Sequence, residues 1–352
     1  MNGPLLKVEN LTKHYPLGSG IFKKSIPVVR AVEDVSFSVE AGETFCIVGE
    51  SGCGKSTFAR LLMRLVKPTS GRVIIDGTDI AGLKKHALHA WRRRMQMVFQ
   101  DPYSSLNPRL TAGQIIIEPV ENFERLSRKR RQALAADLLR KVGMSPEMMH
   151  RLPSELSGGQ RQRLGIARAL SLNPSLIIAD EAVSALDVSV QAQILNLLLD
   201  LQQQMGIAFV FISHDLGVVE HIAHRVAVMY LGRIVELAPC EALFANPVHP
   251  YTEALIAAAP VPDPTRIRVE APVEGEVPSP INPPSGCAFH PRCPLAVERC
   301  RNELPPLVPM PDGRVVACHV RAPATGIPGR LAEVCVQSLA HIASASRSLD
   351  LT

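Results

Sequence analysis

Short segments in the first hundred residues carry the pattern of β-strands. They are residues 5–8, 35–39, 44–48, 72–76 and 95–99. The first two alternate apolar and polar side chains, as strands of a half-buried antiparallel sheet do. Residues 44–48 are continuously apolar, which predicts a buried central strand. A glycine-rich turn follows, and then the helical pattern of residues 58–65. We therefore expect a strand, a tight turn and a helix in succession at this point.

The middle of the chain is helical, and the part after it alternates between strands and helices. The helical pattern covers residues 109–153 and includes a basic stretch at 125–131, which we interpret as a solvated helix face. Later strands are predicted at residues 176–179, 207–212 and 225–230, with a helix at 188–205. Such alternation predicts a mainly parallel α/β sheet. We therefore expect an α/β domain with a helical subdomain inserted at about residues 109–172.

The composition separates the last part of the chain from the rest. Of the 29 prolines, 18 lie between Pro247 and Pro328, and four of the eight cysteines lie between Cys287 and Cys318. Helical patterns at 241–244 and 252–258 give way to this proline-rich sequence. The expected parts are a first domain at residues 1–238, a cysteine- and proline-rich extension at 239–321, and a partly disordered tail at 322–352 with a helix at 330–340.

Charge and aromatic content narrow the class of protein. The net charge is only +5, and 15 of the 352 residues are aromatic, which disfavours a stacking surface for single-stranded nucleic acid. An apolar run long enough to span a bilayer is absent from the sequence, and the first residues lack the pattern of a secretory signal. We therefore expect a cytosolic chain, in which clustered cysteines favour metal or redox chemistry over disulfides.

Residues 49–57 match the pattern of a loop that binds nucleotide phosphates. They are Gly49, Glu50, Ser51, Gly52, Cys53, Gly54, Lys55, Ser56 and Thr57. The match follows a predicted strand and opens a predicted helix, the context in which this motif binds phosphate. Glycines let backbone N–H groups approach the phosphate oxygens, and the helix N-terminus adds partial positive charge. The motif predicts that Lys55 binds the β- and γ-phosphates and that the Ser56 hydroxyl binds Mg²⁺.

Two carboxylates directly follow the apolar run at residues 176–179. Asp180 is placed to hold Mg²⁺, and Glu181 to polarise a water that attacks the γ-phosphate. Acids after a strand are commonly solvated turn residues, so the pair gains its meaning from the phosphate loop. Together, the two motifs predict a nucleotide-hydrolysing site.

A second glycine motif occurs at residues 156–160. Ser157 is a good helix N-cap, and Gly158 and Gly159 expose N–H groups to an anion before Gln160. The helix is expected to continue through residue 170. A second anion site, far in sequence from the first, suggests a γ-phosphate held between two subunits.

With these motifs the chain resembles the ATP-binding-cassette family over about its whole length. By that resemblance, Gln100 senses Mg²⁺ and couples to a membrane partner, and His214 is a switch that contacts the γ-phosphate. Tyr15 matches the aromatic that stacks on adenine, and Asp187 lies in the loop that crosses the dimer interface. Two cassettes then close on two ATP molecules, and Ser157–Gln160 of one subunit complete the site of the other. Ala182 stands where the family usually has proline.

The chain is most similar to ATPase subunits of dipeptide and oligopeptide importers, especially their second, F-type, subunit. The segments that carry this likeness are residues 100–108, 187–193 and 246–252, the last with His249, Pro250 and Tyr251. The resemblance implies three kinds of partner: a second ATPase, two permease subunits and an extracytoplasmic substrate-binding protein. It also implies a place on the cytoplasmic face of the bacterial inner membrane.

Other functions stay open at this point. Relatives with these motifs import nickel or glutathione. A different class is a soluble iron–sulfur cassette protein that acts on ribosomes or nucleic acid, although such proteins usually carry two cassettes in one chain. A drug exporter is disfavoured by the residues 249–251 and by the cysteine-rich extension.

Four cysteines of the extension form the candidate metal site. They are Cys287, Cys293, Cys300 and Cys318. Zinc sites usually pair cysteines two to four residues apart, and every gap here is longer. Four thiolates also suit an iron–sulfur cluster. The resemblance implies the same, since members of this subfamily can carry a four-iron cluster on such cysteines. We favour a [4Fe–4S] cluster over zinc, with four incidental thiols as the alternative.

Overall fold

The structure is a computed structural model that describes residues 3–18, 27–259 and 275–323. The predicted tail, apart from residues 322 and 323, and its predicted helix lie outside the described residues. The chain divides into two compact units. The first combines residues 1–40, 45–82 and 214–352, and the second combines residues 41–44 and 83–213.

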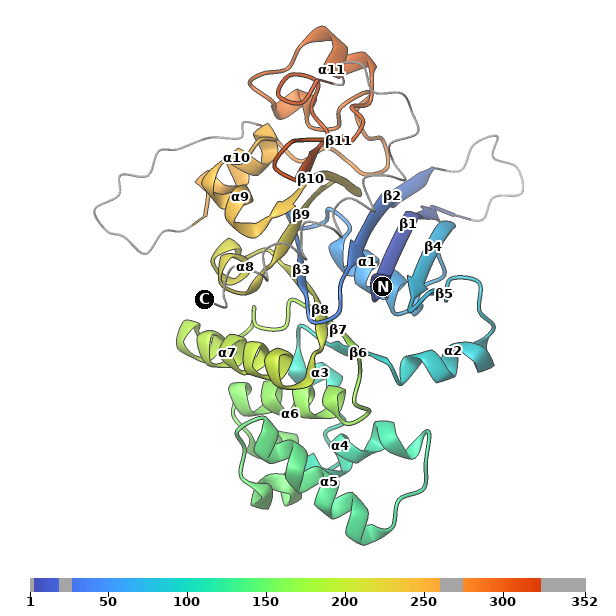
Figure 1. Cartoon of the computed structure of the whole chain (residues 1–352), viewed down its shortest axis with the longest axis vertical. Helices are drawn as coiled ribbons and strands as arrows, with labels where there is room; N and C mark the ends of the chain where they lie inside the picture. Colours follow the sequence, from blue (N-terminus) through green and yellow to red (C-terminus); the bar gives the residue numbers. More distant parts are fainter. Residues whose placement is uncertain (1–2, 19–26, 260–274, 324–352) are drawn as a thin grey trace. The chain divides into compact units, whose positions relative to one another are not determined.

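An antiparallel sheet forms the N-terminal part of the first unit. Its strand order is β2-β1-β4-β5 (Figure 1). The strands are β1 (Leu6–Pro16), β2 (Val28–Val39), β4 (Ser70–Ile75) and β5 (Thr78–Asp79). Leu6 pairs with Val39 and Val8 with Phe37, and all four side chains are buried. The antiparallel pairing predicted from the alternating pattern is therefore confirmed.

A second group of strands in this unit has the order β11-β12-β10-β9-β3. The strands are β3 (Thr44–Val48), β9 (Arg225–Tyr230), β10 (Arg233–Pro239), β11 (Val308–Pro309) and β12 (Val315–Val316). β3 and β9 are parallel, whereas β10 pairs antiparallel with β9 and β12. The helices are α1 (Lys55–Leu62), α8 (Leu216–Ile222), α9 (Cys240–Ala245), α10 (Pro250–Ala257) and α11 (Glu298–Asn302), with a 3₁₀ turn at η3 (His290–Arg292).

Three aromatic side chains connect the two sheets of this unit to its first helix. Phe37 of β2 stacks on Phe45 of β3 with ring centroids 4.3 Å apart, and Phe58 of α1 lies 5.6 Å from Phe37. Phe45 and Phe58 are fully buried. Because the burial of such large apolar side chains is strongly stabilising, they hold β3 and the first turn of α1 against β2.

The second unit contains parallel strands and the helical insertion. Strands β8 (Ala208–Ser213), β7 (Leu176–Asp180) and β6 (Met95–Val98) lie in that order and run parallel. α4 (Ala112–Glu121) packs against α5 (Arg128–Lys141), η1 (Pro146–His150) and α6 (Gly158–Leu170). The unit also contains α2 (Lys85–Arg92), α3 (Pro102–Ser105), η2 (Pro153–Glu155) and α7 (Val188–Met205).

The basic stretch at residues 125–131 lies on the surface, as predicted, with all but Leu126 exposed. The strand predicted at 44–48, the helix at 188–205 and the strand at 225–230 have the predicted bounds. Sequence patterns missed α2 and the paired strands β11 and β12. β12 is only two residues long, so its strand character depends on pairing with β10 rather than on a periodic pattern.

Candidate nucleotide site

The predicted phosphate loop lies between β3 and α1, within the first unit. Gly54 is the N-cap of α1 with φ 108°, and no side chain caps this helix end. A Cβ at Gly54 would clash with the carbonyl oxygen of Ala31, and one at Gly49 with that of Met229. Only glycine combines a positive φ with such close backbone approach. No side chain therefore caps this helix start, and its partial positive charge favours an anion.

Lys55 holds the loop together from inside. Its ammonium group donates hydrogen bonds to the carbonyl oxygens of Gly49 at 2.6 Å and Glu50 at 2.9 Å. The residue is buried, whereas Ser51 and Gly52 are exposed, and Ser56 and Thr57 are half-buried. The positive charge of Lys55 therefore lies at the base of a loop whose outer residues face solvent, as a phosphate site requires.

Cys53 is a buried member of the same loop. Burial raises the pKa of its thiol, and the neighbouring charge of Lys55 counteracts this only in part. Its sulfur lies 3.8 Å from the Lys55 nitrogen. Because the thiol is buried and stays neutral, Cys53 packs the inside of the loop and does not present a reactive group to solvent.

Glu50 connects the phosphate loop to the C-terminal part of the first unit. Its backbone N–H donates to the Tyr251 hydroxyl at 2.8 Å, and its carboxylate accepts two hydrogen bonds from Arg292, at 2.8 and 3.0 Å. These bonds to Glu50 raise the pKa of the Arg292 guanidinium. Sequence reasoning placed Tyr251 in a family signature without a role and missed Arg292, since nothing local to residue 292 points to residue 50.

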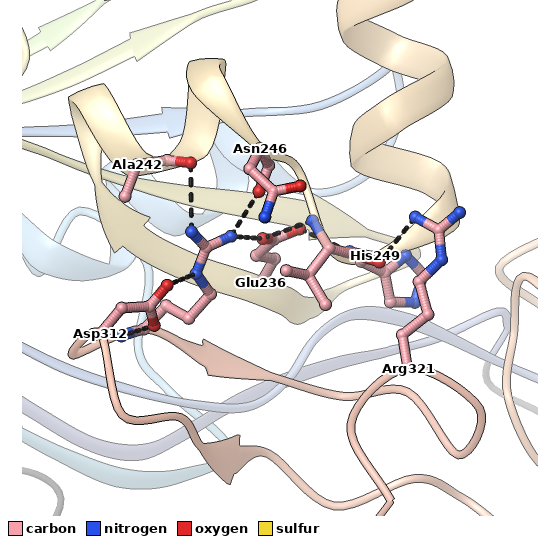
Figure 2. A network of polar contacts seen from close by, with 8 residues as sticks. Glu236, Ala242, Asn246, His249, Asp312 and Arg321 are labelled. Carbon is pink, nitrogen blue, oxygen red and sulfur yellow. Dashed lines mark hydrogen bonds and ion pairs between the residues drawn. The ribbon is translucent and has the colours of Figure 1, made fainter.

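Figure 2 shows a polar network around the buried Glu236, at the turn that precedes α10. Glu236 is fully buried on β10, and its carboxylate accepts from the backbone N–H groups of Val248 and His249 at 3.0 and 2.8 Å. Arg314 pairs with Glu236 and Asp312 and donates to the carbonyl oxygens of Asn246 and Ala242. The network therefore holds the turn that precedes α10.

His249 caps α10 from this turn. Its Nδ1 accepts the backbone N–H of Tyr251 at 3.0 Å, and the side chain is almost completely buried. Burial, and to a smaller extent the nearby charge of Arg321, lower the pKa of His249 to about 4. The imidazole is therefore neutral at neutral pH, which leaves Nδ1 free to accept the capping bond.

In the second unit the structure brings Gln100 and Glu181 together. The Gln100 amide nitrogen lies 2.7 Å from a carboxylate oxygen of Glu181. Asp180 is buried at the end of β7, and Glu181 follows with φ 49°. The Glu181 backbone is held by a bond from its N–H to the Ile212 carbonyl at 2.9 Å. A non-glycine residue in this left-handed conformation is a strained position of the kind that clusters at functional sites.

The predicted second anion motif opens α6. Ser157 is the N-cap, with a capping box in which its hydroxyl accepts from the Gln160 N–H and the Gln160 side chain accepts from the Ser157 N–H. Gly158 lies beside the loop that precedes α7, because a Cβ there would lie 3.6 Å from Leu186. Asp187, the N-cap of α7, is exposed. The N-terminus of α6 is therefore formed as the sequence predicts.

The remaining predicted residues lie in the first unit. Tyr15 is half-buried at the end of β1, with the Lys13 ammonium group 4.7 Å from its ring centroid. His214 is exposed and precedes α8, whose N-cap Asp215 accepts from the N–H groups of Gly217 and Val218. Both residues lie near the surface, where a ligand can reach them.

The four cysteines of the extension are neighbours, but their geometry does not confirm a metal site. Burial, and the proximity of the other three thiols, raise the pKa of Cys287 to about 11, and the pKa of Cys293 is also raised. The Cys287 N–H donates to the Cys300 carbonyl at 2.8 Å. In the described part of the chain, no group of three or more Cys, His, Asp or Glu side chains could hold one metal ion. The predicted cluster thus lacks support from the coordination geometry of the described residues.

A further property bears on membrane association. None of the helices within residues 3–18, 27–259 and 275–323 is both long enough and apolar enough to cross a bilayer.

Known proteins match the chain over most of its length. Residues 32–184 match the ABC transporter family, and residues 235–300 match the oligopeptide/dipeptide transporter C-terminal region. The chain is 82% identical over 324 residues to the probable peptide ABC transporter ATP-binding protein y4tS of Sinorhizobium fredii, covering 92% of each chain. It is 51% identical over 317 residues to the di/tripeptide transport ATP-binding protein DppF of Pseudomonas aeruginosa, covering 90% of this chain and 97% of that protein.

A solved structure of a dimeric ATP-binding cassette bound to ADP and Pi is also similar. Its TM-score is 0.60 at 32% identity, and the match covers 67% of this chain and 98% of that one. The predicted cassette fold and the predicted family resemblance are therefore confirmed.

Proposed function

The chain belongs to the family of peptide ABC transporter ATP-binding proteins, and from this premise we propose that it hydrolyses ATP to drive import of dipeptides or oligopeptides. The observation that carries the proposal is the phosphate loop: glycine-bounded, at an uncapped helix start, with the buried Lys55 at its base. The relatives named above transport peptides, which supports the substrate class. Substrate contacts would lie on other subunits, so a transport assay must distinguish peptides from the alternative substrates nickel and glutathione.

The residues of each unit take the following roles in this proposal. The loop N–H groups and Lys55 bind the phosphates, and Tyr15 stacks on adenine. The Ser56 hydroxyl, the Gln100 amide and the Asp180 carboxylate offer oxygen donors, the ligand type that Mg²⁺ prefers. Bound Mg²⁺ would neutralise charge on the phosphates. Glu181 is the general base for the attacking water, oriented by Gln100, and His214 contacts the γ-phosphate.

We extend the same proposal to assembly. Ser157, Gly158, Gly159, Gln160 and Asp187 of one subunit contact ATP held by the phosphate loop of another. The partner is a second, related ATPase, and the pair acts on two permease subunits supplied by a substrate-binding protein. This assembly lies on the cytoplasmic face of the inner membrane. For the domain organisation we propose a cassette at 1–238 with a helical insertion at 109–172, an extension at 239–321 and a tail at 322–352.

The hydrolytic role is tested with Glu181→Gln. The amide keeps the size of the side chain but cannot accept the water proton, so turnover should fall about a hundredfold or more. ATP affinity should stay near the parent value, because the phosphate loop is unchanged. Glu147→Gln, an exposed acid at the start of η1, serves as the matched control and should hydrolyse at the parent rate. Parent-like turnover of Glu181→Gln would refute the assignment.

Transport is tested in vesicles that contain the permease subunits and the substrate-binding protein. ATP hydrolysis by the chain should rise when dipeptide is present, and nickel or glutathione should not replace dipeptide. Recovery of ribosomes instead of permeases in a pulldown would contradict the importer function. That alternative receives no support from the similarity of residues 235–300 to a transporter-specific region.

We propose, last, that Cys287, Cys293, Cys300 and Cys318 hold a [4Fe–4S] cluster. Support comes from the clustering of the four cysteines within the proline-rich extension and from the backbone contact between Cys287 and Cys300. A four-iron cluster is larger than a single ion, so its ligands need not converge on one point. Anaerobically purified protein should contain iron and acid-labile sulfide, which Cys300→Ser should lose and Cys240→Ala should keep. Stoichiometric zinc without iron would refute the cluster.

A further inference from the structure

We infer that Arg292 of the C-terminal extension is a positioning residue for ATP binding, acting through the carboxylate of Glu50 in the phosphate loop. The contact joins residues 242 positions apart within the first unit. It places a side chain of the cysteine-rich segment next to the nucleotide site. The inference concerns ATP affinity, and it holds whether or not the four cysteines bind a cluster.

Arg292 and Glu50 form a bidentate ion pair. Arg292 Nη1 lies 2.8 Å from one oxygen of Glu50, and Nη2 lies 3.0 Å from the other. A guanidinium that binds both oxygens fixes the carboxylate in orientation as well as in distance. The side chain of Arg292 is 7% exposed and that of Glu50 is 27% exposed, so solvent screens the pair only in part.

Arg292 lies beside an aromatic cluster formed by Tyr230, Tyr251 and Phe289. The Tyr230 hydroxyl accepts from Arg292 at 3.4 Å, and the guanidinium lies 5.9 Å from the Phe289 ring centroid. The rings of Tyr230, Tyr251 and Phe289 contact one another, with centroids 4.6 to 5.4 Å apart, and all three are buried. Arg292 is therefore held on rigid, buried side chains rather than on a loose surface loop.

Tyr251 of the same aromatic cluster also contacts the backbone of Glu50. The hydroxyl of Tyr251 accepts the Glu50 N–H, while Lys55 donates to the Glu50 carbonyl. The N–H, the carbonyl and the carboxylate of one loop residue thus each have a partner. Two of these three partners, Tyr251 and Arg292, come from beyond residue 249.

A functional reason follows from charge. Glu50 lies in a loop that is to receive the phosphates of ATP, and a free carboxylate there would repel them. Arg292 cancels that charge and prevents the side chain from turning toward the phosphates. A buried ion pair is by itself weak support for stability, because apolar pairs often replace it without loss. Its place on the phosphate loop points to ligand binding instead.

The test measures Mg-ATP affinity, KM and kcat of the full chain for five variants. Arg292→Gln should weaken ATP binding and raise KM about tenfold while kcat stays within about twofold, since binding rather than the chemical step is affected. Arg292→Lys keeps the charge but not the bidentate contact, so it should bind ATP more tightly than Arg292→Gln but less tightly than the parent. Arg299→Gln is the matched control, an exposed arginine of the same segment that pairs with Glu303, and it should bind ATP like the parent.

The double variant Glu50→Gln/Arg292→Gln decides whether Arg292 acts through Glu50. If it does, the double variant should bind ATP no more weakly than Arg292→Gln alone. Affinity losses of the single variants that multiply in the double variant would overturn the inference, as would parent-like affinity of Arg292→Gln. Thermal melting checks that each variant folds. If Arg292→Gln does not fold, the ATP affinity of Glu50→Gln, which changes a partly exposed side chain of the loop, is compared with that of the parent.

Discussion

Two helix starts in this protein carry the predicted anion-binding motifs, yet they are built in opposite ways. The start of α6 is a local structure: Ser157 and Gln160 cap it reciprocally, within four consecutive residues. The start of α1 has no side-chain cap, and its N-cap Gly54 has a left-handed backbone. The preceding loop is instead held at Glu50 by Tyr251 and Arg292, 201 and 242 residues away.

The difference has a physical reason. A capping box satisfies helix N–H groups with side chains and so stabilises the helix in any context. A phosphate loop must keep those N–H groups available, and therefore cannot be stabilised by a cap of its own. Its conformation has to be fixed from outside, by backbone approach and by contacts from distant parts of the chain.

The largest effect is expected when a methyl group is added at Gly54, and the matched change at Gly158 should have a much smaller effect. Gly54→Ala should destabilise the protein by roughly 2–4 kcal/mol and abolish ATP binding, because the Cβ meets the Ala31 carbonyl in a left-handed backbone. Gly158→Ala should change stability by no more than about 1 kcal/mol, since its Cβ has room and alanine favours helix. Chemical denaturation and ATP titration of the single subunit measure both. Equal losses of stability in the two variants would contradict the proposed difference between the two helix starts.

Acid should weaken the region around α10. His249 has a pKa of about 4 in the folded protein against an ordinary value of 6.5, so protonation favours the unfolded state. The stabilisation from the neutral imidazole is complete above pH 6.5 and is lost as pH falls through 4. At 1.36 kcal/mol for each unit of pKa, it amounts to about 3 kcal/mol.

The measurement is the free energy of unfolding between pH 7 and pH 4, in the parent and in His249→Asn. Asparagine can accept the Tyr251 N–H but does not titrate in this range, so its profile should be flatter. Identical slopes in the two proteins would exclude His249 as the cause. Hydrogen exchange should locate the acid-induced opening near α10, with α6 protected at both pH values.

The smallest effect is expected at the cap of α6. Ser157→Ala should cost about 1 kcal/mol, because one N–H loses its acceptor. Ser127→Ala at the cap of α5, which lacks the reciprocal bond, should cost no more. The cost of Ser157→Ala should be the same in the parent and in the Arg292→Gln background, since the α6 cap is local. A different cost in the two backgrounds would show that this helix start also depends on the extension.

Sequence patterns predicted the elements whose pattern is long or strongly apolar. The buried strand at 44–48 and the helix at 188–205 have the expected bounds. The cap at Ser157 was also predictable, since its partner is three residues away. Short strands such as β12 were missed, because pairing rather than periodicity makes them strands.

The sequence by itself determined the motifs: the phosphate loop, the acids Asp180 and Glu181, and the capped start of α6. Each depends on chain neighbours, and local rules reach only about four residues along a helix. Only the tertiary structure decided what holds the loop, since Glu50 contacts Tyr251 and Arg292 across more than 200 residues. The same holds for the Gln100–Glu181 contact, 81 residues apart, because hydrogen bonds depend on distance in space and leave no periodic mark in the sequence.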